Sequence, residues 1–191
     1  MKKILLSPVV VALFLSSAVS MAAQDKEQMI QQSRQAIQVF AKTLKGELKA
    51  AIKKGGPVNG IEVCNTKAID ITMGVSKNQN VQLSRTSLKT RNDSNTPTEW
   101  QRKVLHEFEA RKSKGESPKK MEYSDIVEVD GKKQFRYMKA IGTGQVCLNC
   151  HGEKVLPAVE AKLSALYPDD KARGYHKGDI RGAFVLIKDI K

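Results

Sequence analysis

A pentapeptide, CLNCH at residues 147–151, sets narrow limits on how this chain folds, because it joins two cysteines and a histidine in the pattern C-x-x-C-H. In an exported protein this spacing is the attachment signature of a c-type haem. Cys147 and Cys150 would form thioether bonds with the haem vinyl groups. The adjacent His151 would reach the iron from the same face, with its other ring nitrogen orienting it through a hydrogen bond. The motif occurs once, which predicts one covalent haem c.

Three other interpretations of this motif are weaker. A thioredoxin-like redox pair needs a βαβ context, which the surrounding sequence lacks. A zinc site needs two further ligands, which Cys64 and His176 would have to supply. A structural disulfide between the two cysteines does not require the adjacent histidine. We therefore favour haem.

The N-terminus, MKKILLSPVVVALFLSSAVSMAAQ, resembles a secretory signal peptide. Two lysines precede an apolar stretch over 4–19, and small residues follow it, with cleavage expected after Ala22 or Ala23. We predict a signal peptide over 1–22, a single domain over 23–191 and a periplasmic protein without a stable membrane span after cleavage. The alternative is an uncleaved anchor, although the apolar stretch is short for a span.

The chain is strongly basic, with 33 Lys and Arg residues against 20 Asp and Glu residues and a formal net charge of +13. Such a charge raises the question of nucleic acid. Export and the even scatter of the lysines argue against a nucleic-acid partner. We expect a solvated basic surface; the alternative is attraction to an acidic partner or an anionic membrane surface.

Apolar spacing predicts helices in the first part of the chain. The stretch 24–54 has one apolar stripe at three- and four-residue spacing, and KKGGP ends it. A second helix over 59–74 has its own stripe, which includes Cys64 and extends to Val75. The sulfur of Cys64 is therefore expected to face the interior.

The middle of the chain indicates a strand, a polar loop and a third helix. Residues 81–87 alternate like a strand. We expect the helix to begin with Thr96 as its N-cap, Pro97 at its first position and Glu99 completing a capping box. His106 would be exposed. The expected buried face consists of Trp100, Val104, Leu105 and Phe108.

The last part of the chain is rich in strand signals. A β-hairpin over 121–142 is expected to turn at Asp130–Gly131. A short helix over 156–168 follows, and a strand over 179–190 ends the chain. The fold class is α+β, with one sheet and helices packed around it.

The second axial ligand of the iron stays open from the residues alone. The side chains able to ligate iron are Cys64, His106, His176, Met29, Met73, Met121 and Met138. Cys64 lacks a disulfide partner if the motif cysteines bind haem. The spacing alone favours two interpretations of Cys64 about equally: an iron ligand and an ordinary buried core residue. Arg85 and Arg91 would suit the haem propionates, because a guanidinium binds a carboxylate bidentately; the alternative is that they order their loop.

Four segments, IEVCNTKA, LSRTSLKTRNDSNTPTEW, CLNCHG and GYHKGDIRGAF, together resemble an exported c-type haem protein family with a PAS-like haem domain, long classed as a domain of unknown function. The resemblance covers nearly the whole mature chain. It implies a PAS-like antiparallel sheet flanked by helices, with a long N-terminal helix. It also implies iron ligation by the motif histidine and by a cysteine of an N-terminal helix, here His151 and Cys64. Position 176 is not usually histidine in the family, which leaves His176 as a rival ligand.

These observations favour a periplasmic monohaem protein that senses redox state or a diatomic gas through Cys/His ligation. The alternative is an electron-transfer cytochrome c with a redox partner protein. A peroxidase-like enzyme is the third hypothesis, although the sequence offers no convincing distal acid–base set.

Overall fold

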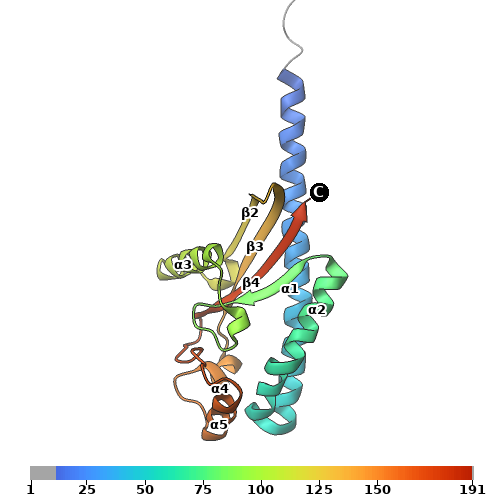
Figure 1. The fold of residues 1–191 in the computed structure, drawn as a ribbon. Helices are drawn as coiled ribbons and strands as arrows, with labels where there is room; N and C mark the ends of the chain where they lie inside the picture. The colour runs from blue at the N-terminus through green and yellow to red at the C-terminus, as the bar shows by residue number, and fades with distance from the viewer. Residues whose placement is uncertain (1–11, 191) are drawn as a thin grey trace, which may run out of the picture.

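The computed structural model describes residues 12–190, with side chains from residue 24. The predicted signal peptide, 1–22, lies outside the described side chains, and its cleavage stays a prediction. Four antiparallel strands form one sheet, with the long helix α1 and helix α2 on one face and α3 on the other (Figure 1). The expected α+β class, the flanked antiparallel sheet and the long N-terminal helix are confirmed.

Helix α1 (Ala12–Glu62) bends back on itself at two glycines. Gly55 and Gly56 leave helical geometry, the latter with φ 75°, a value that glycine adopts without strain. The expected break is therefore confirmed, but the helix resumes at once with Pro57. The resulting two arms pack closely, because a Cβ added to Gly60 would lie 2.9 Å from a side-chain methyl of Leu48.

The second arm does not continue as one α-helix. A π-helical turn (Val63–Lys67) carries Cys64, and α2 (Ala68–Gln79) follows it. Helix α2 includes Thr72 and Gly74 and therefore runs beyond the expected end at 74. It ends where Asn80 adopts a left-handed conformation (φ 50°). The predicted apolar stripe is confirmed as a buried side, since Ile61, Ala68 and Val75 are buried and Cys64 is half-buried. Its two ends pack against different elements, Ile61 beside α5 and Val75 beneath the sheet.

The sheet has the order β1-β4-β3-β2, so the last strand of the chain lies in its middle. The strands are β1 (Gln82–Thr86), β2 (Glu122–Val129), β3 (Lys132–Gly142) and β4 (Ile180–Ile190). The expected hairpin turn is confirmed: Asp130 and Gly131 both have positive φ, at 51° and 73°. Strand β4 pairs on both sides, and its apolar residues are buried on both faces of the sheet because α3 covers one face and α1 and α2 cover the other.

Helix α3 (Glu99–Ser113) begins two residues later than expected. The predicted capping box of Thr96 and Glu99 is wrong, because the backbone N–H of Thr96 closes a 3₁₀ turn (Asp93–Asn95) by bonding Asp93. Thr98 is the N-cap instead, and its N–H donates to Oε1 of Gln101 at 3.2 Å. The expected packing face is confirmed, with Trp100 half-buried beside Val104, Leu105 and Phe108, and His106 is exposed.

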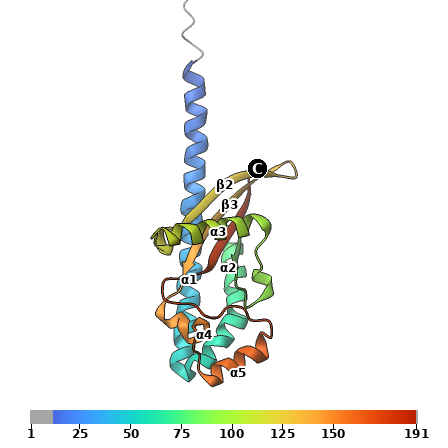
Figure 2. The same ribbon diagram turned by 90° about the vertical axis from the view of Figure 1, so that its left-hand side faces the viewer.

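The CLNCH motif lies at the end of the molecule beyond the sheet, next to the bend of α1 (Figure 2). It forms a 3₁₀ turn (Gln145–Cys147) and the single-turn helix α4 (Leu148–His151), and α5 (Pro157–Leu166) follows. A third short apolar cluster joins this end to α1; its members include Ile61, Cys150, Val159, Leu163 and Tyr167. The motif lies in short, irregular structure, but this apolar cluster packs it against α1 and α5.

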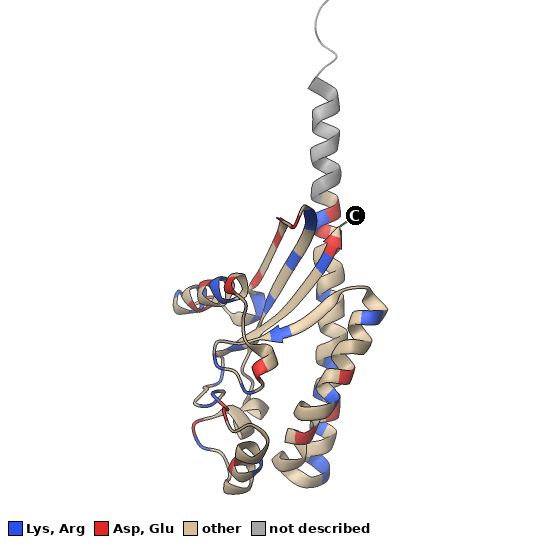
Figure 3. Cartoon of the chain, in the orientation of Figure 1, with Lys and Arg blue, Asp and Glu red and all other residues tan. Residues whose placement is uncertain are grey.

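Charged side chains are spread over the helices, strands and loops (Figure 3). Lysine and arginine do not gather on one element in this view, in keeping with the expected scatter. One cluster is well defined: Glu122 on the edge strand β2 accepts hydrogen bonds from Arg34 and Lys139. Within the described part of the chain, no helix is both long and apolar enough to span a membrane.

Candidate haem site

A cavity of about 240 Å³ lies between the π-helical turn, α2, β1 and the attachment motif. Its walls include four of the residues predicted for the site, namely Cys64, Arg85, Arg91 and His151. Cys64 and His151 are far apart in sequence, so the fold itself brings the two predicted axial ligands to one space. A smaller cavity of about 120 Å³ shares five wall residues with it: Arg85, Arg91, Asn95, His151 and Arg181.

His151 is held as a neutral imidazole in one orientation. Its Nδ1 lies 2.8 Å from the carbonyl oxygen of Ala172. Because a carbonyl only accepts, Nδ1 carries the proton and the lone pair is on Nε2. Burial, with Arg181 and Arg91 nearby, holds the pKa of His151 well below its usual value. The imidazole is therefore neutral, the form that binds a metal.

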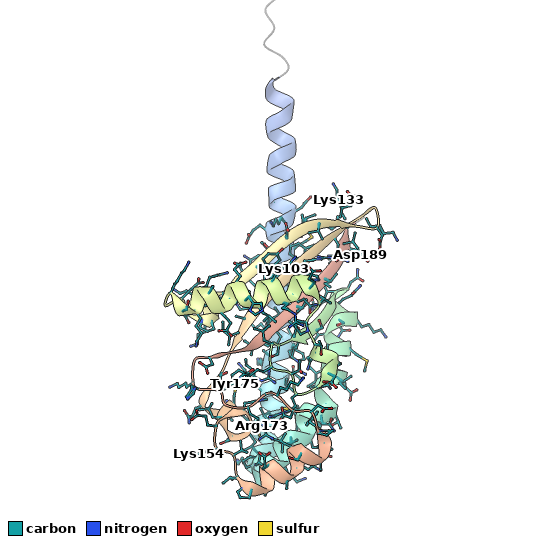
Figure 4. All side chains as sticks on the ribbon, turned by 60° about the vertical axis from the view of Figure 1, so that its left-hand side comes forward. Lys103, Lys133, Lys154, Arg173, Tyr175 and Asp189 are labelled. Carbon is teal, nitrogen blue, oxygen red and sulfur yellow. The ribbon has the colours of Figure 1, made fainter. Side chains whose placement is uncertain are left out.

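Tyr175 contacts this histidine through both its ring and its backbone. The two rings meet edge to face, with centroids 6.2 Å apart. The Tyr175 N–H also donates to the His151 carbonyl at 2.9 Å. Figure 4 shows Tyr175 and Arg173 toward the motif end of the molecule, far from the hairpin end marked by Lys133 and Asp189.

Cys64 is half-buried, and its sulfur is a free thiol, as are those of Cys147 and Cys150. Burial raises the pKa of the Cys64 thiol, whereas Arg85 and then Arg91 act in the opposite direction. The π-helical turn that carries Cys64 is tied to the end of α5, since the Tyr167 hydroxyl donates to Oδ1 of Asn65 at 3.1 Å. Short π-helical segments occur frequently at functional sites.

Three guanidinium groups in the wall carry more positive charge than nearby acids balance. Arg91 pairs with Asp170 at 3.0 Å. Arg85 lies over the Phe40 ring, 5.5 Å from its centroid, and within residues 24–190 neither it nor Arg181 forms an ion pair. Nε of Arg91 and Nε of Arg181 are buried without a hydrogen-bond partner. Arg85 and Arg181 are half-buried. An anionic partner would offset the cost of removing such cations from water.

This donor set fits a haem. A haem has two propionate carboxylates, which match the two guanidiniums that lack an acid, and guanidinium–carboxylate pairs are strong. Ile69 and Met73 of α2 line the same cavity and are exposed, which offers apolar contact for a porphyrin edge. Cys147 and Cys150 lie half-buried on the short helical segment that ends in His151. The residues present therefore suit the group that the motif predicts.

Of the rival ligands, Met73 alone lines the cavity, and the others lie outside its wall. His176 is 67% exposed and faces Glu153 and Asp179 at 3.4 and 3.6 Å. Met121 and Met138 are fully buried in the core on the α3 side of the sheet, which leaves Met73 as the methionine in the cavity wall. Among the described side chains, no three or more His, Cys, Asp and Glu residues are grouped to hold a metal ion, so the geometry gives no support to a zinc site.

The sequence profile of the Tll0287-like family matches residues 16–188, which is most of the chain. The chain belongs to the Tll0287-like family. Among solved structures, this Tll0287-like chain is similar to the crystal structure of the cyanobacterial haem protein Tll0287, with a TM-score of 0.64 and 18% sequence identity. The match covers 86% of this chain and 96% of the other, so the two share a fold. No curated protein matches this chain.

Two wall residues of this Tll0287-like chain escaped the sequence analysis. Arg181 is the second residue of the last strand, and Tyr167 follows directly after α5. Each is distant in sequence from the other site residues. A basic residue directly before a run of apolar strand residues was the available signal for Arg181. Tyr167 had none, since an aromatic residue at a helix end is ordinary core material.

Proposed function

We propose that this chain is an exported, monohaem c-type haem-binding protein that senses redox state or a diatomic gas. Cys147 and Cys150 would hold the haem covalently, with His151 and Cys64 as the axial pair. The observation that carries the proposal is that Cys64 and His151 share one cavity with guanidiniums that lack acids. The name of the similar solved structure, a cyanobacterial haem protein, supports haem as the ligand.

A bound haem would supply a redox-active iron whose gas binding depends on the groups around its free position. The chain's own residues have distinct parts. His151 presents Nε2 because Ala172 holds its Nδ1 proton. Arg85 and Arg181 would bind the propionates. Cys64 would act as a displaceable ligand, because it lies on a π-helical turn rather than in regular helix.

The test is a set of absorption spectra of protein matured with haem-attachment machinery, recorded oxidised, reduced, and reduced under CO. Wild type, Cys64→Ala and the matched control His176→Ala are compared. We expect His176→Ala to match wild type and Cys64→Ala to lose the ferric low-spin spectrum. CO binding by the reduced wild type would support a sensor. A sixth ligand retained on reduction, without CO binding, would instead show an electron carrier with a redox partner protein.

Export to the periplasm is a second part of the proposal. It is supported by the signal-like N-terminus and by the compartment that c-type attachment requires in the motif's usual context. Cell fractionation and intact mass of the mature protein would test it. A mature chain that begins after Ala22 or Ala23 in the periplasmic fraction is expected; a full-length chain in the membrane fraction would show an uncleaved anchor.

A further inference from the structure

Arg91 lies where two segments that flank His151 meet. Its side chain is 9% exposed, and its Nη2 group contacts three acceptors. The carbonyl oxygen of Cys150 lies at 2.6 Å, a carboxylate oxygen of Asp170 at 3.0 Å and the carbonyl oxygen of Ala172 at 3.3 Å. The first acceptor belongs to the attachment motif and the other two to the loop beside it. Arg91 therefore fastens these two segments together.

The orientation of the His151 ring depends on the backbone of Ala172. Its carbonyl accepts from both His151 Nδ1 and Arg91 Nη2. Its N–H donates to Oδ1 of Asp170 at 2.9 Å. Asp170 is itself 5% exposed and also accepts from Arg173 Nε at 2.6 Å. Both backbone polar groups of Ala172, its N–H and its C=O, are thus fixed by a buried ion pair.

We propose that Arg91 and Asp170 are positioning residues for the proximal histidine. Together they set the Ala172 carbonyl so that His151 keeps its proton on Nδ1 and one ring orientation. Partners beyond the ligand shell of metal-binding histidines commonly have this role. Buried ion pairs are weak contributors to stability compared with apolar packing, which favours a role in geometry. The proposal rests on His151 as an axial ligand, and it assigns the propionates to Arg85 and Arg181.

The test compares ferric EPR spectra and reduction potentials of wild type, Arg91→Lys, Asp170→Asn and the control Glu160→Gln. Lysine keeps the charge of Arg91 but lacks the planar fork. The control removes the negative charge of Glu160, which pairs with Arg173 at 2.6 Å, and leaves Arg91 untouched. We expect the single set of EPR g-values to shift or split in both test variants and to stay unchanged in the control. Wild-type g-values and potential in both test variants would overturn the proposal.

A haem stain of the denatured proteins separates this inference from the proposed function. Wild type without covalent haem would refute the proposed function, and the positioning role with it. Covalent haem in wild type with unchanged spectra in both test variants would refute the positioning role alone. If the test variants do not fold, the rate of solvent exchange of the His151 Nδ1–H proton is measured by NMR in the reduced wild type. Slow solvent exchange supports a fixed hydrogen bond to Ala172, and exchange too fast to observe contradicts it.

Discussion

A single side-chain hydrogen bond connects α5 to the turn that carries Cys64, and its energy can be measured. The Tyr167 hydroxyl donates to Asn65 at 3.1 Å, and Tyr167 is 8% exposed. Buried neutral hydrogen bonds contribute about 0.5–1.5 kcal/mol net. Since 3.1 Å is long for a bond between two oxygens, we expect the lower half of that range, about 0.5–1 kcal/mol.

A double-mutant cycle isolates this energy. Tyr167→Phe, Asn65→Ala and the double variant are unfolded with urea, and the free energy of unfolding of each haem-loaded protein is compared with wild type. Each single variant should be destabilised, and the double variant should lose about 0.5–1 kcal/mol less than the sum of the two. Additivity within about 0.3 kcal/mol would show that the two groups do not interact, and the assignment of Tyr167 as a tether would be wrong.

Three further predictions concern charge and backbone. Burial alone would raise the pKa of Glu122, but hydrogen bonds from two basic side chains lower it to about 2, below its usual 4.5. Its contribution to stability is therefore complete above pH 4.5 and is lost as the pH falls toward 2, so Glu122→Gln should flatten the acid-unfolding curve in that interval. Gly182→Ala should lower the free energy of unfolding by about 2–4 kcal/mol in urea, because φ is +156° and the new Cβ would lie 2.2 Å from the Thr86 carbonyl oxygen. Gly115→Ala, at φ +89° with open space, is the matched control and should lose less. Arg181→Met should lower the haem reduction potential in a spectroelectrochemical titration, because it removes a cation from the cavity wall; an unchanged potential would place Arg181 away from the haem.

Local signals identified most elements of the fold. The hairpin turn at Asp130–Gly131 needs positive φ at both positions, and aspartate followed by glycine allows it. Gly55, Gly56 and Pro57 indicated the break in α1 because these residues do not readily continue a helix. The strand order was not predictable, because nothing local says that β4 pairs between β1 and β3. The start of α3 was missed by two residues because a neighbouring 3₁₀ turn competed for the backbone of Thr96.

The residues of the candidate site were likewise predictable from local sequence only in part. The motif cysteines and His151 follow one another in sequence, so their spacing alone indicates their chemistry. Cys64 could be proposed from a helical stripe and a family resemblance. Arg181 and the Asp170 loop join the site only through long-range contacts with the segment after β1, which no periodicity reports.

The π-helical turn has a consequence for helical phase. In an uninterrupted α-helix, residues fourteen apart, such as Ile61 and Val75, differ in direction by only about 40°. Here Ile61 packs beside α5 and Val75 beneath the sheet. The π-helical turn at 63–67 lies between these two packing surfaces and changes the helical phase from one to the other. Cys64 lies within this turn. A change that restored regular α-helical geometry in this turn would rotate the Cys64 thiol relative to the face of α2 that packs on the sheet. The direction of the sulfur is therefore linked to how α2 packs on the sheet.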